Sequence, residues 1–386
     1  MFERWLSLPV NKSCLIVGPR RSGKTTLLRH RHPELKYATL DDLDDLDWAK
    51  RDPKGFISSL GRHAVIDEIQ RLPVLTVAVK YAIDNENARF LMTGSSTLGL
   101  LDAAADTLAG RIEIISLPTA CWGEDQGEAT HSIIEERQAF PNLKEAERQL
   151  RTALTYGQFP EVLMQDSDEK KHQVLINYRN TYFTKDLMQL SNIENLDGLL
   201  AIFQHLTRSL GSHLEASNFA REAGISFPTT KKYLNALQQT QLTFKLYGYQ
   251  YGPAKRYIKA SKTYFADNGI IHSLNAGVSE GQLIENFVIS ELEKRRKIGT
   301  IPCDQFYYYR SAAGREIDLL FEVEDTVHAV EIKATKRPGP KAFQNLKQFD
   351  DRLGRPVRRF LIYLGEEYAD EDNIRLIPIS ALYRGK

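Results

Sequence analysis

The stretch GPRRSGKT at residues 18–25 decides the fold of the first third of the chain, because it fits the pattern G-x-x-x-x-G-K-T. An apolar run at 14–17 precedes it, and an amphipathic stretch at 26–28 follows it. A strand, a glycine-rich loop and a helix in this order are typical of the phosphate-binding loop of P-loop proteins. The sequence therefore predicts a nucleotide site that takes ATP with Mg²⁺. The alternative is a glycine-rich turn beside a surface lysine.

Each part of this loop has a chemical use. Glycines let the backbone curl so that successive N–H groups face the phosphates, and the N-terminus of the following helix adds positive potential. Lys24 is expected to reach the β- and γ-phosphates, and the Thr25 hydroxyl to ligate Mg²⁺. We expect the loop contacts to the nucleotide to come from Gly18, Arg21, Ser22, Gly23, Lys24, Thr25 and Thr26.

A second apolar stretch, at 64–66, ends in two adjacent acids, Asp67 and Glu68. Unpaired carboxylates are costly to bury, so a strand has no structural use for such a pair. In an ATPase, Asp67 would hold Mg²⁺ through water, and Glu68 would polarise the attacking water. We therefore predict that Asp67 belongs to the Mg²⁺ site and that Glu68 is a catalytic residue.

Two further segments could complete the nucleotide site. The apolar run at 89–93 ends in hydroxyl residues, and in many ATPases such a strand lies between the other two. Its tip, Thr93 or Ser95, would then sense the γ-phosphate, although the segment could also be a plain Gly/Ser turn. Arg111 opens another strand and could neutralise transition-state charge, within its own chain or from a neighbouring subunit. It could equally be a surface cation that pairs with Glu113.

Alternation of strands and helices over residues 1–122 predicts an α/β domain with a parallel sheet. The acidic run at 41–47 is expected to be a loop and the start of a helix. Strands are expected at 14–17, 37–41, 64–67, 89–93 and 112–117, with helices at 24–31, 73–84 and 97–109.

We expect residues 123–275 to form a largely helical region that contains a winged helix at about 195–250. The signals are a short helix capped by Ser217 and closed at Gly224, a second helix over 229–239, and a strand over 242–246. Lys231 and Lys232 in the first turn of the second helix would contact DNA phosphates. Lys255 and Arg256 lie in a stretch that mixes basic and aromatic residues, which favours nucleic-acid binding. The alternative is a scaffold that packs against the ATPase domain or a partner.

Residues 276–386 contain a third group of candidate site residues. Asp318 lies in an apolar strand, and Glu331 and Lys333 lie two apart on the next, so both point to one face. An acid followed by E-x-K is the metal site of the PD-(D/E)XK nuclease fold, a restriction-endonuclease-like α+β domain. Asp318 and Glu331 would hold Mg²⁺, Lys333 would activate water, and Glu285 would complete the shell. The alternative is a buried ion-pair network without catalysis.

Composition sets wide limits on these readings. The chain has 386 residues, 42% of them hydrophobic, and a formal net charge of +1. Its length favours two or three domains. Because the overall charge is balanced, any basic surface that binds DNA must be confined to one part of the chain. No run approaches the ~18 apolar residues of a membrane helix, so no membrane partner is expected. Three widely spaced cysteines fit neither a disulfide framework nor a zinc cluster, which favours the cytoplasm.

The whole chain resembles the prokaryotic AAA-type P-loop ATPases that carry a C-terminal domain of unknown function. The shared features are GPRRSGKTT, VIDEIQ, LMTGSS, LAGR, GQFPE, KTYFADNGI, ENFVISEL and AVEIK. The resemblance implies ATP binding by Lys24, Thr25, Asp67 and Glu68, and a nuclease-like domain on the four residues of the last third. GQFPE departs from the more usual double-glycine form, so that turn is expected to differ.

Two functions follow from these signals. The first is a DNA-directed motor or processing ATPase. The second is a nucleotide-dependent switch that regulates a protein partner, with a nuclease-like domain that only binds. A homo-oligomer is compatible with both.

Overall fold

A computed structural model describes the chain except residues 1, 95–106, 128–129, 137–139, 141, 188–192, 194, 214, 251–260, 276, 312, 351–353 and 386, and the side chains of 183–186. The described residues form two compact units. The first comprises Glu3–Thr119 with Gln239–Gln241, and the second is made chiefly of Ala120–Gln238 and Leu242–Lys386.

A parallel sheet forms the centre of the first unit, as the sequence predicts. Among the described residues it has the order β2-β3-β4-β1-β5, and every neighbouring pair is parallel. The hydroxyl-ended strand β4 lies between β1 and β3, the place expected for it. The strands are β1 (Ser13–Val17), β2 (Lys36–Thr39), β3 (His63–Asp67), β4 (Arg89–Gly94) and β5 (Ile112–Ser116).

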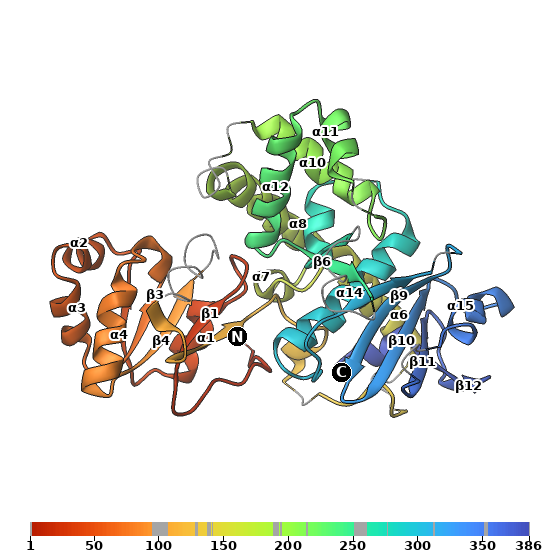
Figure 1. Cartoon of the computed structure of the whole chain (residues 1–386), viewed down its shortest axis with the longest axis horizontal. Coiled ribbons are helices and arrows are strands. Elements are labelled where there is room, and N and C mark those ends of the chain that lie inside the picture. The colour runs from red at the N-terminus through yellow and green to blue at the C-terminus, as the bar shows by residue number, and fades with distance from the viewer. Residues whose placement is uncertain are drawn as a thin grey trace. The chain divides into compact units, whose positions relative to one another are not determined.

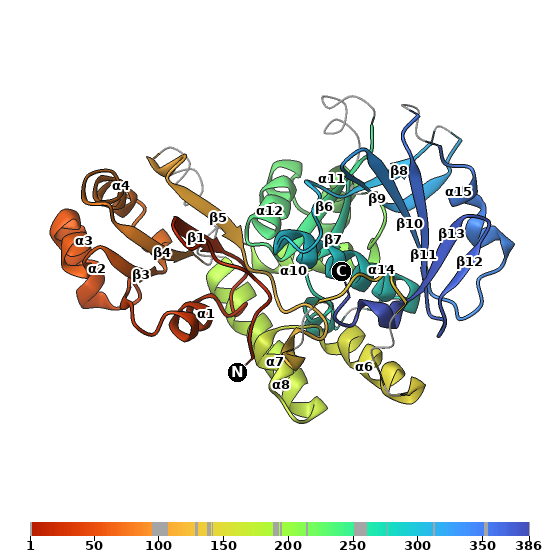
Figure 2. The same cartoon turned by 90° about the horizontal axis from the view of Figure 1, so that it is seen from below.

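Helices cover both faces of this sheet, with α1 and α4 on opposite sides (Figure 2). Strand β1 is therefore buried along its whole length, as is usual for a central parallel strand. The acidic run starts a helix as predicted, because the Asp42 side chain accepts hydrogen bonds from the N–H groups of Asp44 and Asp45. The helices are α1 (Lys24–Arg31), α2 (Leu43–Arg51), α3 (Pro53–Leu60), η1 (Ile69–Arg71) and α4 (Leu75–Glu86). Most of the predicted helix at 97–109 lies outside the described residues.

The second unit is built on a mixed sheet with the order β12-β13-β11-β10-β9-β8-β6-β7 among the described residues. Its strands β9, β10 and β11 lie side by side in Figure 1. Strands β8, β9 and β10 form an antiparallel meander, and β10 continues into the parallel strands β11 and β13. The strands are β6 (Thr243–Gly248), β7 (Lys262–Phe265), β8 (Tyr307–Arg310), β9 (Glu316–Val323), β10 (Thr326–Lys333), β11 (Val357–Tyr363), β12 (Ala369–Glu371) and β13 (Ile374–Pro378).

The longest described helix of the second unit, α14, packs against that sheet through a buried apolar face. A reciprocal capping box between Ser279 and Gln282 starts α14. The helices are η2 (Glu124–Gln126), α6 (Leu143–Tyr156), α7 (Pro160–Leu163), α8 (Asp168–Tyr178), the π-helix η3 (Arg179–Asp186), α10 (Leu196–Arg208), α11 (Ala216–Ala223), α12 (Phe227–Gln239), α13 (Asn268–Ser273), α14 (Glu280–Lys297), η5 (Pro340–Phe343), α15 (Gln344–Lys347) and η6 (Ile379–Leu382).

The helix–turn–helix segment differs from the expected one in detail. The N-cap of α11 is Glu215, so Ser217 lies inside the helix and the predicted Ser217 cap is wrong. Its closure at Gly224 is confirmed, because that residue adopts the left-handed conformation with φ 64°. Helix α12 begins at Phe227, two residues before the predicted start.

The turn of the GQFPE motif is explained by an acid more than a hundred residues away. Gly157 has φ 67°, and a Cβ there would lie 1.7 Å from Asp267 Oδ1. Gln158 N–H donates to both carboxylate oxygens of Asp267, at 3.2 and 3.0 Å. Asp267 also accepts from Lys294 Nζ at 3.1 Å, so the motif is fixed by a buried charged group.

Two remaining expectations concern membranes and cysteines. Across the described part of the chain, no helix combines the length and apolarity that crossing a membrane requires. Cys14 and Cys121 are free and buried, and Cys303 is free and half-buried.

Candidate functional sites

The loop of residues 18–25 connects the end of β1 to the start of α1. Arg21 and Gly23 both have positive φ, at 61° and 90°, so the backbone turns sharply before the helix. A Cβ at Gly18 would lie 2.1 Å from the Leu117 carbonyl oxygen, which leaves room only for glycine. Ser22 Oγ is buried without a hydrogen-bond partner among the described atoms, whereas Thr26 and Arg21 are exposed. A curled backbone with an unused buried hydroxyl fits a ligand that accepts hydrogen bonds.

Lys24 is buried beneath this loop. Its ammonium group donates to the carbonyl oxygens of Gly18 and Pro19, at 2.9 and 3.0 Å. Burial lowers the pKa of Lys24 to about 8, against the charges of Glu68 and Asp67, which raise it. An anion bound in the loop would therefore favour the charged form of this lysine.

Asp67, at the end of β3, receives hydroxyl donors from three other elements. Thr25 Oγ1 donates to its two carboxylate oxygens at 2.9 and 3.1 Å, and Tyr37 Oη donates at 2.7 Å. Thr93 Oγ1 donates as well. Burial and the bond to Asp67 raise the pKa of Tyr37 to about 12. The structure thus joins Thr25, Asp67 and Thr93, which the sequence predicts, with Tyr37, which it does not.

Glu68 lies beside this cluster on a constrained backbone. Its φ of 56° is in the left-handed region, where a non-glycine residue is uncommon. Its N–H donates to Thr93 Oγ1 at 3.1 Å, and its carboxylate accepts from Gln70 Nε2. Glu68 is half-buried, so its carboxylate retains access to solvent.

Arg111 lies at the other end of the sheet. It precedes β5, whose first residue pairs with the first residue of β1, whereas the loop follows the last residue of β1. Arg111 Nε lies 2.7 Å from Asp84 Oδ1, and Glu113 is instead 3.9 Å from Lys12. Arg111 therefore pairs with Asp84 instead of Glu113, and it lies away from the loop of its own chain. Its role in neutralising transition-state charge stays a prediction.

Arg4, which the sequence reading did not single out, contacts the loop from the N-terminal side. It is buried and donates to the carbonyl oxygens of Ser22 at 2.7 Å, Pro118 at 3.0 Å and Thr119 at 3.3 Å. Arg31 donates in turn to the Arg4 and Leu6 carbonyl oxygens. These bonds fix the backbone of the loop at Ser22, because the Ser22 carbonyl oxygen is held by a buried charged donor.

We expect Arg4→Ala to weaken ATP affinity about tenfold, or ~1.4 kcal/mol. It would leave three backbone carbonyls without their charged donor, and it would release the loop backbone. Arg4→Lys should recover part of the affinity, because the ammonium reaches one carbonyl. Equilibrium binding of a fluorescent ATP analogue measures this, with Arg51→Ala at the exposed end of α2 as the control. Equal affinity in Arg4→Ala and the control would contradict the expected effect.

The predicted acids Asp318 and Glu331 lie on neighbouring strands of the sheet in the second unit. Ile332 N–H donates to Asp318 Oδ2 at 2.8 Å, and Lys333 Nζ lies 2.6 Å from Glu331 Oε1. Burial, then the charge of Asp318, raises the pKa of Glu331 to about 8. Burial and Asp318 also raise the pKa of Glu285. These four residues therefore share one electrostatic environment.

Lys262 and Tyr264 of β7 belong to the same cluster, although the sequence singled out their segment, KTYFADNGI, only as a family feature and gave it no role at this site. Lys262 Nζ is buried, lies 4.0 Å from Glu285 Oε1, and pairs with Glu316. Tyr264 Oη donates to Glu285 Oε1 at 2.7 Å. Burial raises the pKa of Asp318, although the charges of Lys333 and Lys262 oppose this shift.

The fit of this cluster to a metal ion is partial. Within the described residues, no three His, Cys, Asp or Glu side chains are grouped to hold a metal. Glu331 Oε2, however, is buried without a hydrogen-bond partner there, which leaves one hard oxygen for a cation.

The two predicted DNA-contacting lysines of α12 are exposed. Lys231 Nζ lies 4.5 Å from the centroid of the Phe227 ring, and Lys232 is next to it in the first turns. Lys255 and Arg256 lie outside the described residues.

Comparison with known proteins gives the class of the first unit. Residues 10–125 match the model of an AAA domain, and residues 147–281 and 280–382 match two domains of unknown function, DUF8612 and DUF4143. The first unit is therefore similar to AAA-type P-loop ATPase domains. The predicted bounds at residues 122 and 275 stay predictions.

Relatives extend over most of the chain. The uncharacterized proteins Mb2031c of Mycobacterium bovis and Rv2008c of Mycobacterium tuberculosis are each 25% identical over 378 residues, which is 94% of this chain and 79% of theirs. The uncharacterized protein MJ1544 of Methanocaldococcus jannaschii is 24% identical and covers 89% of this chain and 81% of its own. The Walker-type ATPase PABY2304 of Pyrococcus abyssi aligns with 68% of this chain and 90% of its own, at a TM-score of 0.41 and 16% identity.

Proposed function

We propose that the chain hydrolyses Mg–ATP at residues 18–25 and acts on DNA through its second unit. The observation that carries the nucleotide part is the convergence of Thr25, Asp67 and Thr93, from α1, β3 and β4, beside the buried Lys24. The DNA-directed role is a separate part of the proposal, and it rests on exposed basic residues of the second unit.

Each side chain of the nucleotide site has a separate task in this proposal. Lys24 balances the negative charge of the β- and γ-phosphates, and the loop N–H groups orient them. Thr25 and Asp67 supply the oxygen atoms that would hold Mg²⁺, which when bound neutralises phosphate charge. Glu68 positions a water molecule and accepts its proton, and Thr93 fixes the Glu68 backbone.

The DNA part of the proposal rests on the order of elements after α10. Helices α10, α11 and α12 are followed by the antiparallel pair β6–β7, which is the order of a winged helix. Lys231 and Lys232 are exposed at the start of α12, where a DNA-bound helix contacts phosphates. We propose that α12 is the DNA-contacting helix.

Lys231→Glu with Lys232→Glu should weaken DNA binding about tenfold or more for every sequence, because phosphate contacts carry no base information. Basal ATP turnover should stay unchanged. Low-salt gel shifts measure the binding, and the matched control is Lys170→Glu with Lys171→Glu, two lysines in the first turn of α8. If both double variants bind DNA equally, α12 is a scaffold.

A second candidate is a nucleotide-dependent switch whose C-terminal domain only binds. The pairs Lys333–Glu331 and Lys262–Glu285 favour it, since lysines neutralise acids that a nuclease would use for metal. Against it, the order α14-β8-β9-β10-β11, with Asp318 on β9 and E-x-K on β10, supports the restriction-endonuclease-like reading. There, Glu331 and Asp318 would hold Mg²⁺, and Lys333 would orient water.

The two candidates differ in how Glu331 responds to pH and metal. Its pKa of about 8 in the folded chain lies above the ordinary 4.5, so folding favours its protonated form. This contribution to the free energy of unfolding is complete below pH 4.5 and is lost as the pH rises through about 8. Glutamine has the shape of the protonated glutamate and does not ionise. The free energy of unfolding of Glu331→Gln should therefore rise relative to that of the parent, by up to a few kcal/mol, between pH 5 and pH 9.

Urea unfolding of parent and variant across that range measures the difference. If the cluster binds metal, Mn²⁺ should stabilise the parent more at pH 9 than at pH 6, because ligation requires the ionised carboxylate. Mn²⁺ that stabilises neither protein at either pH would leave the ion-pair switch as the better account.

A further inference from the structure

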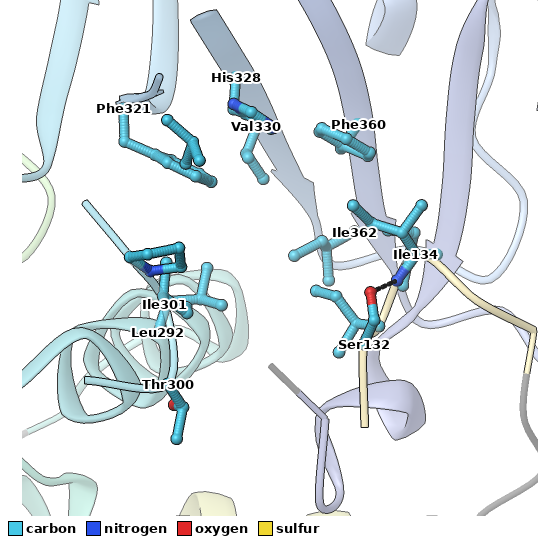
Figure 3. Close-up of a pocket in the computed structure, with 14 residues that line it drawn as sticks. Ser132, Ile134, Leu292, Thr300, Ile301, Phe321, His328, Val330, Phe360 and Ile362 are labelled. Atoms are coloured by element: carbon cyan, nitrogen blue, oxygen red, sulfur yellow. Dashed lines mark hydrogen bonds between the residues drawn. The ribbon is translucent and has the colours of Figure 1, made fainter. Parts of the chain in front are cut away.

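The carboxylate of Asp67 has an unusual set of hydrogen bonds. Most side-chain hydroxyls in proteins bond to water or to backbone groups close to them in the chain. Ser132 is an ordinary case, because its Oγ accepts from the N–H of Ile134 (Figure 3). At Asp67, by contrast, three hydroxyls from different elements donate to one buried carboxylate. They belong to Thr25 of α1, Tyr37 of β2 and Thr93 of β4.

Tyr37 reaches Asp67 along the pair of strands β2 and β3. Thr39 is the residue of β2 that pairs with Asp67, and Tyr37 pairs with Val65, two residues earlier on each strand. Side chains two apart on a strand lie on the same face, so the ring of Tyr37 extends towards Asp67 on that face. Tyr37 is half-buried, which leaves water as an alternative partner, yet its Oη donates to Asp67 Oδ2 at 2.7 Å.

Arg29 of α1 packs on the ring of Tyr37. Its guanidinium carbon lies 3.9 Å from the centroid of the ring, which is within the range of a cation–π contact. Arg29 is exposed and follows Thr25 by four residues, so both side chains lie on the same side of α1. Helix α1 therefore contacts Asp67 directly through Thr25 and indirectly through Arg29 and Tyr37.

The three donors restrict the orientation of the Asp67 carboxylate. A carboxylate has about four lone-pair sites for hydrogen bonds, and the hydroxyls occupy most of them. Because the donors stand on different elements, the carboxylate cannot turn without breaking at least one bond. Asp67 and Thr25 offer the hard oxygen atoms that Mg²⁺ prefers, so they fit the ion expected with ATP.

We propose that Tyr37 is a positioning residue for Mg²⁺ at the nucleotide site, and that Arg29 acts through it. The inference rests on the proposed ATP site and deepens it. The hydroxyl of Tyr37 holds the carboxylate of Asp67 in one orientation, as partners of metal ligands commonly do. A donor also withdraws charge from the carboxylate. Orientation has the larger effect here, because Asp67 would hold the ion through water and through Thr25.

Tyr37→Phe tests the proposal, because it removes the hydroxyl and keeps the ring on which Arg29 packs. Binding of a fluorescent, slowly hydrolysed ATP analogue to the chain of 386 residues is measured against Mg²⁺ concentration. We expect the Mg²⁺ concentration at half-maximal binding to rise about tenfold. In EDTA, without Mg²⁺, the affinity should equal that of the parent, because the loop N–H groups and Lys24 still bind the phosphates.

Tyr81 of α4 is the matched control. It also has a cation over its ring, since Lys54 Nζ lies 4.4 Å from the ring centroid. Tyr81 is exposed, and within the described part of the chain its hydroxyl forms no hydrogen bond. Tyr81→Phe should therefore leave the Mg²⁺ requirement unchanged.

Arg29→Ala tests whether the arginine acts through Tyr37. Alone, it should raise the Mg²⁺ requirement about threefold, in line with the strength of an exposed cation–π contact. Added to Tyr37→Phe it should have no effect, because the ring then carries no hydroxyl to orient. An effect of the same size in both backgrounds would overturn the indirect role of Arg29.

The role of Tyr37 is overturned if Tyr37→Phe and Tyr81→Phe require the same Mg²⁺ concentration. It is also overturned if Tyr37→Phe loses affinity equally with Mg²⁺ and in EDTA, because Tyr37 then supports the fold of the site and not the ion. If a melting curve shows that Tyr37→Phe is unfolded, the Mg²⁺ requirement of Arg29→Ala decides. A parent that binds no ATP with Mg²⁺ would instead remove the nucleotide site itself, and this inference with it.

Discussion

Lys24→Ala should abolish measurable ATP binding, a loss of at least about 100-fold in affinity, or ~2.7 kcal/mol. Lys24 is buried, and its ammonium group already lies among the loop carbonyls of Gly18 and Pro19. Removing it leaves the phosphate charge without its nearest compensating cation. Calorimetric titration with a slowly hydrolysed ATP analogue and Mg²⁺ measures the effect.

The control for this variant is Lys36→Ala, an exposed lysine of β2 whose Nζ contacts only the Ser59 carbonyl in the described hydrogen bonds. A melting curve of Lys24→Ala must show that the first unit stays folded, since the change removes two buried hydrogen bonds. If a folded Lys24→Ala protein binds ATP as the parent does, residues 18–25 are not the phosphate loop.

Glu68→Gln should separate binding from chemistry. Glutamine retains the shape and can still meet Gln70, so ATP affinity should stay within about twofold, while turnover should fall by ~10²–10⁴-fold, the usual contribution of a general base. A drop in kcat without a rise in KM distinguishes lost water activation from lost binding. Glu34→Gln, at an exposed position, is the control.

Turnover by Glu68→Gln at the rate of the parent would remove Glu68 from the reaction. A loss of affinity equal to the loss of turnover would instead assign it a role in holding the nucleotide or its metal.

Local sequence patterns were sufficient for the loop and its flanking elements. The predicted helix at 24–31 has the bounds of α1, and the apolar runs at 14–17 and 64–67 match β1 and β3 within one residue. These features depend on neighbours in the chain: a strand that ends in glycine, a helix that starts at lysine, and acids at a strand end. For the same reason the closure of α11 at Gly224 could be predicted from one residue.

Contacts between distant segments could not be predicted in this way. Tyr37 reaches Asp67 because β2 and β3 are neighbours in the sheet, which no pattern around Tyr37 indicates. Lys262 meets Glu285 and Glu316 only after β7 and β9 join one sheet through β6 and β8. The distance of Arg111 from the loop of its own chain is set by the direction of β5, which no local pattern indicates.

ATP turnover measured against DNA concentration tests the central claim most directly. The parent chain of 386 residues is assayed at low salt with Mg²⁺ and single-stranded, duplex or branched DNA, beside Glu68→Gln and the Lys231→Glu, Lys232→Glu double variant. We expect Mg²⁺-dependent turnover that rises severalfold with DNA, is absent in Glu68→Gln, and stays at its basal rate in the lysine double variant. Turnover that no DNA changes, at a salt concentration where DNA binding would be strongest, would contradict a DNA-directed ATPase.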